Sequence, residues 1–245
     1  MAKLLVLDVE SSGVDVAKDK IIELAYVLWD TDTHKPLLIK SDLIVHLEQQ
    51  LLSSEIVNLT GIDQDILISY GLLPYTVLEN LIELLSGTRI DYIVGHNLIA
   101  FDAPIIEAEM TRNGVVSALF MDFPKLDTRY DLPYPDSCDS RKLKHLAGDH
   151  GFVPIFPHRA LFDVLTTIKI LDQYDFNEIL KYKEIPWVTV RAMVSFQDKD
   201  LAKARKYSWE KLGDKTYPKC WVKMIKEDQL EKEKKEAGFE ISKLV

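Results

Sequence analysis

The segment at residues 3–10, KLLVLDVE, constrains the fold more than any other because an unbroken apolar run there ends in two acids. A short run rich in Leu and Val predicts a buried β-strand. Residues 21–30 and 36–47 are also strand-like, and short polar turns join the three segments. The chain therefore begins with three consecutive predicted strands.

The following part of the chain alternates helix-like and strand-like segments. The strand-like segments are 91–97 and a stretch within 123–132. The helix-like segments are 53–61, 75–87, 101–114, 140–151 and 159–174. Residues 75–87 are the clearest helix, because their apolar positions recur at helical spacing and a glycine follows. This order predicts an α/β domain with a mixed five-stranded sheet flanked by helices.

The pattern changes after Pro186, where a strand, a short helix, a second strand and a charged helix are expected. We therefore predict a domain at residues 1–185 and a small α+β module at residues 186–245. Residues 1–175 carry 14 Lys and Arg against 27 Asp and Glu, whereas residues 176–245 carry 16 against 12. An acidic body with a basic tail leaves a nucleic-acid partner open, because local patches steer polyanions more than net charge does.

Composition narrows the cellular setting. The two cysteines, Cys138 and Cys220, exclude a disulfide scaffold or a cysteine-built zinc site. Asp8 interrupts the N-terminal apolar run too early for a signal peptide, and no apolar run approaches the roughly 20 residues that span a bilayer. The expectation is a cytoplasmic protein without a membrane partner.

Asp8 and Glu10 stand two residues apart at the end of the first predicted strand, so their side chains share one face. An exposed strand end often carries two acids, but this strand is otherwise fully apolar. Burying both carboxylates would raise their pKa values unless a cation compensated them.

Asp102 begins a predicted helix directly after a strand and a loop that contains His96 and Asn97. Acids favour helix N-termini, which explains Asp102 taken alone. The carboxyl ends of strands in an α/β sheet are nevertheless where ligands tend to bind.

Residues 156–171 repeat the combination of an acid with an apolar element. Pro157 favours an extended entry, which places His158 in the loop before a helix and Asp163 inside that helix. Capping explains a lone histidine at a helix start. Together with Asp8, Glu10 and Asp102, the pair instead indicates a proton acceptor and a metal ligand.

D-x-E at residues 8–10, N-x-x-x-F-D at 97–102 and H-x-x-x-x-D at 158–163 resemble the three motifs of the DEDD exonuclease superfamily. The histidine places the resemblance in the histidine-type branch, with the proofreading subunit of bacterial DNA polymerase III, exonuclease X and RNase T. It covers roughly residues 3–174, and KLDTRYDL and KLKHLAGDHGF support it. ESSG departs from the threonines that many members carry after the glutamate.

The resemblance implies a ribonuclease-H-like fold and phosphodiester hydrolysis with two divalent cations, Mg²⁺ or Mn²⁺. It implies that Asp8 bridges both ions, that Glu10 and Asp163 hold the ion that activates water, and that Asp102 supports the second. His158 would be the general base. The substrate-binding residues it implies are Val9, Ser11, Ser12, Asn97 and Phe101, although Phe101 fits the core equally well.

The expected activity is a 3′–5′ exonuclease that releases nucleoside 5′-monophosphates from single-stranded DNA or from the 3′ ends of duplex DNA. A 3′–5′ exoribonuclease of the RNase T or oligoribonuclease type stays open, because the motifs do not read the sugar. A polymerase partner and a catalytically inactive binding module also stay open. In the C-terminal module, lysines alternate with Tyr207, Trp209 and Trp221, which suits either stacking on single strands or a small core.

Overall fold

The computed structural model describes residues 2–47, 52–138, 140–211 and 219–244. They form two compact units, Met1–Leu180 and Lys181–Val245, which we describe separately. The division falls five residues before the expected one at 185/186, inside helix α9 (Phe176–Glu184). Ile179 of α9 is buried in the first unit, so this helix is shared between the two compact regions.

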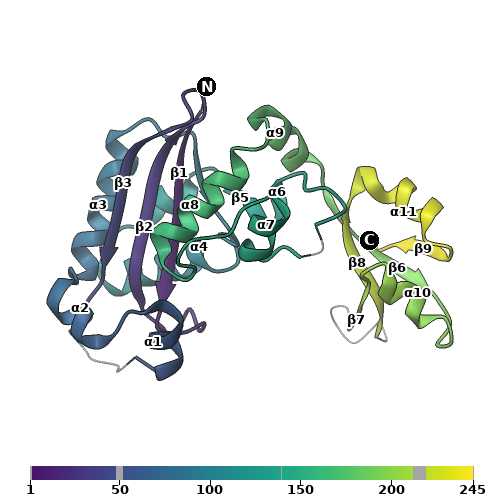
Figure 1. Ribbon diagram of the computed structural model, residues 1–245, viewed down its shortest axis with the longest axis horizontal. Coiled ribbons are helices and arrows are strands. Elements are labelled where there is room, and N and C mark those ends of the chain that lie inside the picture. Colours follow the sequence, from purple (N-terminus) through teal and green to yellow (C-terminus); the bar gives the residue numbers. More distant parts are fainter. Residues whose placement is uncertain (1, 48–51, 139, 212–218, 245) are drawn as a thin grey trace. The chain divides into compact units, whose positions relative to one another are not determined.

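The first unit contains a five-stranded sheet of order β3-β2-β1-β4-β5 (Figure 1). Its strands are β1 (Lys3–Ser11), β2 (Ile21–Asp30), β3 (Lys35–Leu43), β4 (Tyr92–Gly95) and β5 (Lys125–Asp127). β1, β2 and β3 are antiparallel neighbours, whereas β4 pairs in parallel with both β1 and β5. The predicted mixed five-stranded sheet is therefore confirmed.

Helices cover both faces of this sheet. The helices of this unit before α9 are α1 (Ser54–Thr60), α2 (Gln64–Tyr70), α3 (Pro74–Gly87), α4 (Asp102–Arg112), α5 (Ala118–Asp122), α6 (Thr128–Asp131), α7 (Leu143–Asp149) and α8 (Ala160–Leu171), of which α1 and α2 lie at one end of the sheet (Figure 1). Among them, α8 lies against β1 and β2 (Figure 1). Each expected helix is present. α3 begins one residue earlier than expected, the other four expected helices are shorter, and the short helices α2, α5 and α6 are additional.

Burial of β1 on both faces of the sheet explains why its sequence is apolar at successive positions. Leu5 and Leu7 belong to the core on the side of α3 and α4, and Leu4 and Val6 to the core on the side of α7 and α8. Because successive side chains of a strand point to opposite faces, β1 is buried on both. Asp8 and Glu10 have the parity of Leu4 and Val6, so they face α8.

The second unit contains a four-stranded antiparallel sheet of order β7-β8-β6-β9. Its elements are β6 (Trp187–Met193), α10 (Lys199–Ala204), β7 (Ser208–Glu210), β8 (Cys220–Lys226), a 3₁₀ turn (Glu227–Gln229), α11 (Leu230–Glu236) and β9 (Glu240–Lys243). Lys226 is fully buried and donates to the backbone oxygen of Ile185 at 2.8 Å. The expected α+β module is present, with two strands more than expected.

Within the described ranges, no helix has both the length and the apolar character needed to cross a membrane.

Candidate active site

Strand β1 presents two carboxylates on the face that α8 covers. Asp8 and Glu10 are both half-buried, and each has a neighbour on β2 in register, Ala25 and Glu23 respectively. The apolar residues before them fix the strand in the sheet, so the two acids cannot turn to solvent together. Their placement agrees with the expectation that both point to one place.

Helix α4 brings a third carboxylate to β1. Asp102 is its first residue and is only 3% exposed. Its Oδ1 accepts a hydrogen bond from the Val9 backbone N–H at 3.1 Å. Because Val9 lies between Asp8 and Glu10 in the sequence, this bond holds the Asp102 carboxylate close to both acids. Val9 thus contributes its backbone to the site, and its side chain lies in the core.

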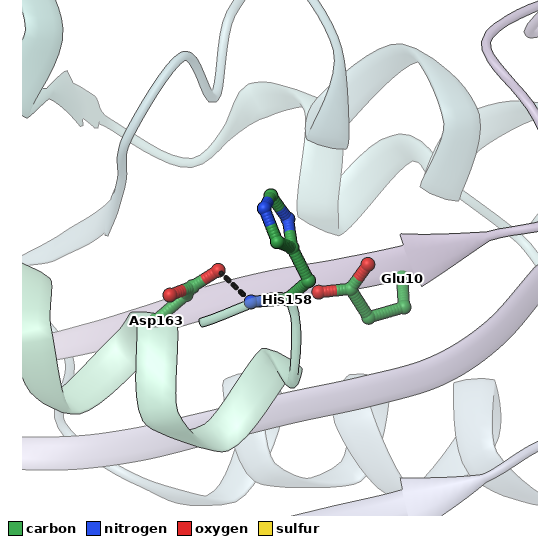
Figure 2. A group of neighbouring side chains, drawn as sticks. All are labelled: Glu10, His158 and Asp163. Atoms are coloured by element: carbon green, nitrogen blue, oxygen red, sulfur yellow. Dashed lines mark hydrogen bonds between the residues drawn. The ribbon is translucent and has the colours of Figure 1, made fainter. Parts of the chain in front are cut away.

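Helix α8 brings the fourth carboxylate together with the histidine (Figure 2). Asp163 Oδ2 accepts the backbone N–H of His158 at 3.1 Å. Glu10, His158 and Asp163 each offer a ligand atom, and these atoms lie within 4.8 Å of one another. His158 is exposed and has a left-handed backbone, with φ of 66°. A helix residue therefore fixes the backbone of the loop histidine and leaves its ring free to face solvent.

Burial and mutual repulsion act on all four carboxylates. Burial, followed by repulsion from Asp102 and Asp163, raises the pKa of Asp8 well above its ordinary range. Burial and the charge of Asp163 raise the pKa of Glu10 to about 8, and burial raises the pKa of Asp102 to about 7. Burial also raises the pKa of Asp163. The site thus brings together four acids whose negative charges repel, and the nearby Arg159 offsets this only in part for Glu10.

The loop after β4 is fixed by Asp127 at the end of β5. This buried carboxylate accepts the backbone N–H groups of Asn97, Ile99 and Arg129 at 2.9 to 3.1 Å. Asn97, expected to touch substrate, has φ of 71° and accepts a hydrogen bond from Arg129 at 2.9 Å. Its side chain is therefore partnered inside this loop.

His96 belongs to the same loop but is not free to act as a ligand. Its ring nitrogens lie 3.0 Å from the Thr128 hydroxyl and 2.8 Å from the Arg141 carbonyl. Burial lowers the pKa of His96 to about 4, so the ring is neutral near pH 7. Its role is structural.

The remaining expected substrate residues occupy different surroundings. Ser11 is the last residue of β1, and Ser12 begins the turn after it, where it donates to Asp19 at 3.1 Å. Phe101 precedes α4 and is partly buried against the core on the α3 side, as its alternative reading allowed.

In the second unit, Tyr207 fits the core alternative rather than a contact with single strands. Tyr207 is 4% exposed and meets Phe239 edge-on at 5.6 Å between ring centroids, so its ring cannot stack on a base. It instead fills the small core. Trp209 is 52% exposed and lies 5.3 Å from Trp221, centroid to centroid.

Two residues beside the site escaped the sequence analysis, Glu23 and Arg159. Glu23 of β2 accepts two hydrogen bonds from the Arg159 guanidinium, at 3.0 and 3.1 Å. An acid inside the apolar segment IIELAYV was the available signal, and it matches the signal that Asp8 gave.

The donor set fits divalent cations. Carboxylate oxygens with one imidazole suit hard ions such as Mg²⁺ or Mn²⁺, and the absence of thiolates argues against softer ones. The raised pKa values of Asp8, Glu10 and Asp102 also indicate a cation site, because a cation between buried acids that repel one another stabilises their charged forms.

A mixed sheet of this order with an acidic centre on β1 is the architecture of ribonuclease-H-like nucleases. The chain matches a family model described as Exonuclease, of the RNase T type, over residues 5–171. The chain therefore belongs to this exonuclease family, within the DEDD superfamily of phosphodiester hydrolases. No curated protein sequence matches it.

Solved structures of Escherichia coli exonuclease I have the same fold. The complex with a dT13 oligonucleotide is 15% identical with a TM-score of 0.67, and the match covers 92% of this chain and 64% of that one. The complex with dA16 is 16% identical with a TM-score of 0.68, covering 98% and 68%. The zinc-bound form in complex with single-stranded DNA is 16% identical with a TM-score of 0.70, covering 98% and 68%. This chain thus spans about two thirds of the length of exonuclease I.

Proposed function

We propose that this chain is a 3′–5′ exonuclease that shortens single-stranded DNA from its 3′ end and releases nucleoside 5′-monophosphates. The observation that carries the proposal is the convergence of Asp8, Glu10, Asp102 and Asp163 with His158 on one end of the sheet. Membership of the exonuclease family supports the reaction class.

We assign each acid a role in holding metal. Glu10 and Asp163 would hold a divalent cation beside His158, Asp8 would serve both cations, and Asp102 would support the second. When bound, two divalent cations neutralise the charge that develops on the attacking and leaving oxygens. They also make an acidic surface able to hold a polyanion.

His158 takes the proton from the attacking water. Histidine is the side chain whose protonation changes most readily near neutral pH. The ring is exposed while its backbone is held by Asp163, so it can reach a water without losing its place. These features favour the histidine-type branch of the superfamily.

DNA is the proposed substrate because the similar structures are complexes with dT13 and dA16. The second candidate is an exoribonuclease of RNase T or oligoribonuclease type, which the family name favours. An inactive binding module is the weakest candidate, because a binding surface does not need five catalytic groups.

Digestion of matched 5′-labelled single-stranded DNA and RNA, with Mg²⁺ or with EDTA, tests this function. We expect a metal-dependent ladder that shortens from the 3′ end, with DNA degraded faster. Asp8→Asn protein is the control for contaminating nucleases and should leave both strands intact. Binding without cleavage by the wild-type protein would refute the enzymatic function, and faster digestion of RNA would select the exoribonuclease.

We further propose that the module at residues 186–245 contacts the strand upstream of the cleaved bond. Trp209 and Trp221 form an aromatic pair, and Lys203 lies 6.0 Å above the Trp221 ring. Stacking of a base on an aromatic ring contributes about 1–3 kcal/mol. Trp209→Ala should therefore raise KM for a long strand and leave dinucleotide hydrolysis unchanged. Phe196, 82% exposed in the same unit, provides the control Phe196→Ala.

A further inference from the structure

Glu23 is a buried carboxylate with an unusually complete set of partners. It is 1% exposed, and besides Arg159 it accepts the Ser41 hydroxyl at 2.9 Å and the Ala160 backbone N–H at 3.0 Å. Buried charges require such compensation, because an unpaired one is strongly destabilising. Glu23 differs in this respect from the acids of the candidate site, for which the described residues supply no Lys or Arg ion pair.

The position of Glu23 relates it directly to the catalytic residues. It is the register partner of Glu10 across β1 and β2, and it faces α8 with Ala25 and Val27 of the same core. The Arg159 guanidinium that it holds also acts on Glu10, where its positive charge lowers the pKa. The ion pair therefore borders the proposed metal site.

The contacts of Glu23 fix the start of α8. This helix has no side-chain cap of its own, and the Glu23 carboxylate takes that role from β2 by accepting the Ala160 N–H. A side-chain acceptor at a helix N-terminus satisfies an otherwise free N–H group. Arg159 is the N-cap residue, and its backbone oxygen accepts the N–H of Asp163 at 3.1 Å.

The fixed residue lies between the two catalytic groups of this segment. Arg159 directly follows His158, whose φ of 66° is a conformation that a side chain other than glycine adopts only when its surroundings hold it. The Asp163 carboxylate holds His158 from one side by the backbone bond, and Glu23 holds the next residue from the other.

We propose that Glu23 and Arg159 are positioning residues that hold the His158 loop over Glu10 and Asp163. This inference rests on the proposed function and adds to it a connection from β2 to the general base. Neither residue touches the reacting atoms in this scheme. Their contribution is to keep the histidine and the metal-binding acids in one geometry.

The test compares Glu23→Gln, Arg159→Gln and Arg159→Lys with a matched pair elsewhere. In the second unit, Glu233 is 7% exposed and accepts hydrogen bonds from Arg205 at 2.9 and 2.7 Å, so Glu233→Gln removes a similar ion pair far along the chain. Melting temperature, kcat and KM are measured for each full-length variant on one single-stranded substrate, well below every melting temperature.

Positioning predicts a fall of about 10- to 100-fold in kcat for Glu23→Gln and Arg159→Gln with KM unchanged, as for residues that orient metal ligands. Arg159→Lys keeps the charge but not the two-point contact, so it should fall between these variants and the wild type. Glu233→Gln should lower the melting temperature and leave kcat unchanged.

Two results would overturn the inference. The first is a Glu23→Gln protein that melts earlier but keeps the kcat of Glu233→Gln, which would make the pair purely structural. The second is a rise in KM for Arg159→Gln alone, which would place Arg159 on the substrate. Wild-type protein without metal-dependent digestion would instead refute the proposed function, and this outcome is distinct from both.

Discussion

Replacing Glu10 with Gln is predicted to stabilise the metal-free protein above pH 8 and to leave it unchanged near pH 4.5. The pKa of Glu10 is raised in the folded state from 4.5 to about 8, so between these values the folded chain binds more protons than the unfolded one. Folding stability then falls as pH rises through this window. The penalty is absent below pH 4.5, complete above pH 8, and removed by a neutral glutamine.

The size of the effect follows from the displaced pKa. Each tenfold change in proton affinity corresponds to about 1.4 kcal/mol, which sets an upper bound of about 5 kcal/mol for Glu10. Glu10 is half-buried, and solvent screening reduces the measurable part to about 2 kcal/mol. For a domain of this size, that corresponds to a rise of about 4–8 °C in melting temperature.

Thermal unfolding of wild type and Glu10→Gln at pH 5 and pH 8.5, each with EDTA or with Mg²⁺, measures the effect. We expect Glu10→Gln to melt higher only at pH 8.5 with EDTA, and the order to reverse with Mg²⁺ because the wild-type acid then binds the cation. Glu83→Gln, an exposed acid of α3, is the control for net charge. Equal melting temperatures for wild type and Glu10→Gln at both pH values in EDTA would refute the electrostatic argument.

Three further predictions follow from single side chains. Asp102→Asn keeps an acceptor for the Val9 N–H, so the melting temperature should hold while kcat falls by about 10³-fold or more, measured on single-stranded DNA. Phe120→Ala empties a fully buried position in the core beside α3, and chemical denaturation should show a loss of about 3–5 kcal/mol. Gly71→Ala places a Cβ 2.5 Å from the Leu67 carbonyl oxygen and 2.8 Å from the Val45 nitrogen, so the melting temperature should fall. An unchanged melting temperature would show that the backbone moves to accommodate the methyl group.

Much of the fold could be predicted because the long elements carry their own pattern. β1 and β2 are mostly apolar, and α3 has apolar positions at helical spacing, so each of these elements can be recognised from its own segment of sequence. β7 and β9 were missed because they are three- and four-residue strands without an apolar pattern. The charged helix expected at the end of this module is short, because Gly238 with φ of 71° follows it and residues from Glu240 form β9.

Some residues of the candidate site could be predicted from the sequence and others could not. Asp8 and Glu10 could be predicted because burying two acids in an apolar strand costs free energy unless a ligand or a partner compensates them. Glu23 gave the same signal, but its partner Arg159 lies far along the chain, and strand register decides that they meet. Tyr207 shows the opposite limit, since alternation of aromatic and basic residues does not reveal which rings the core takes.

The acids that meet at the candidate active site come from β1, α4 and α8, which lie at the beginning, middle and end of the first unit's sequence. A partly synthesised or partly folded chain consequently lacks a complete candidate site, because α8 must dock on β1 and β2 to bring Asp163 to the other acids. Contacts between such distant segments form late, because closing a long loop costs conformational entropy that is offset only when the core packs. Hydrolytic activity should therefore appear only after α8 has docked on β1 and β2.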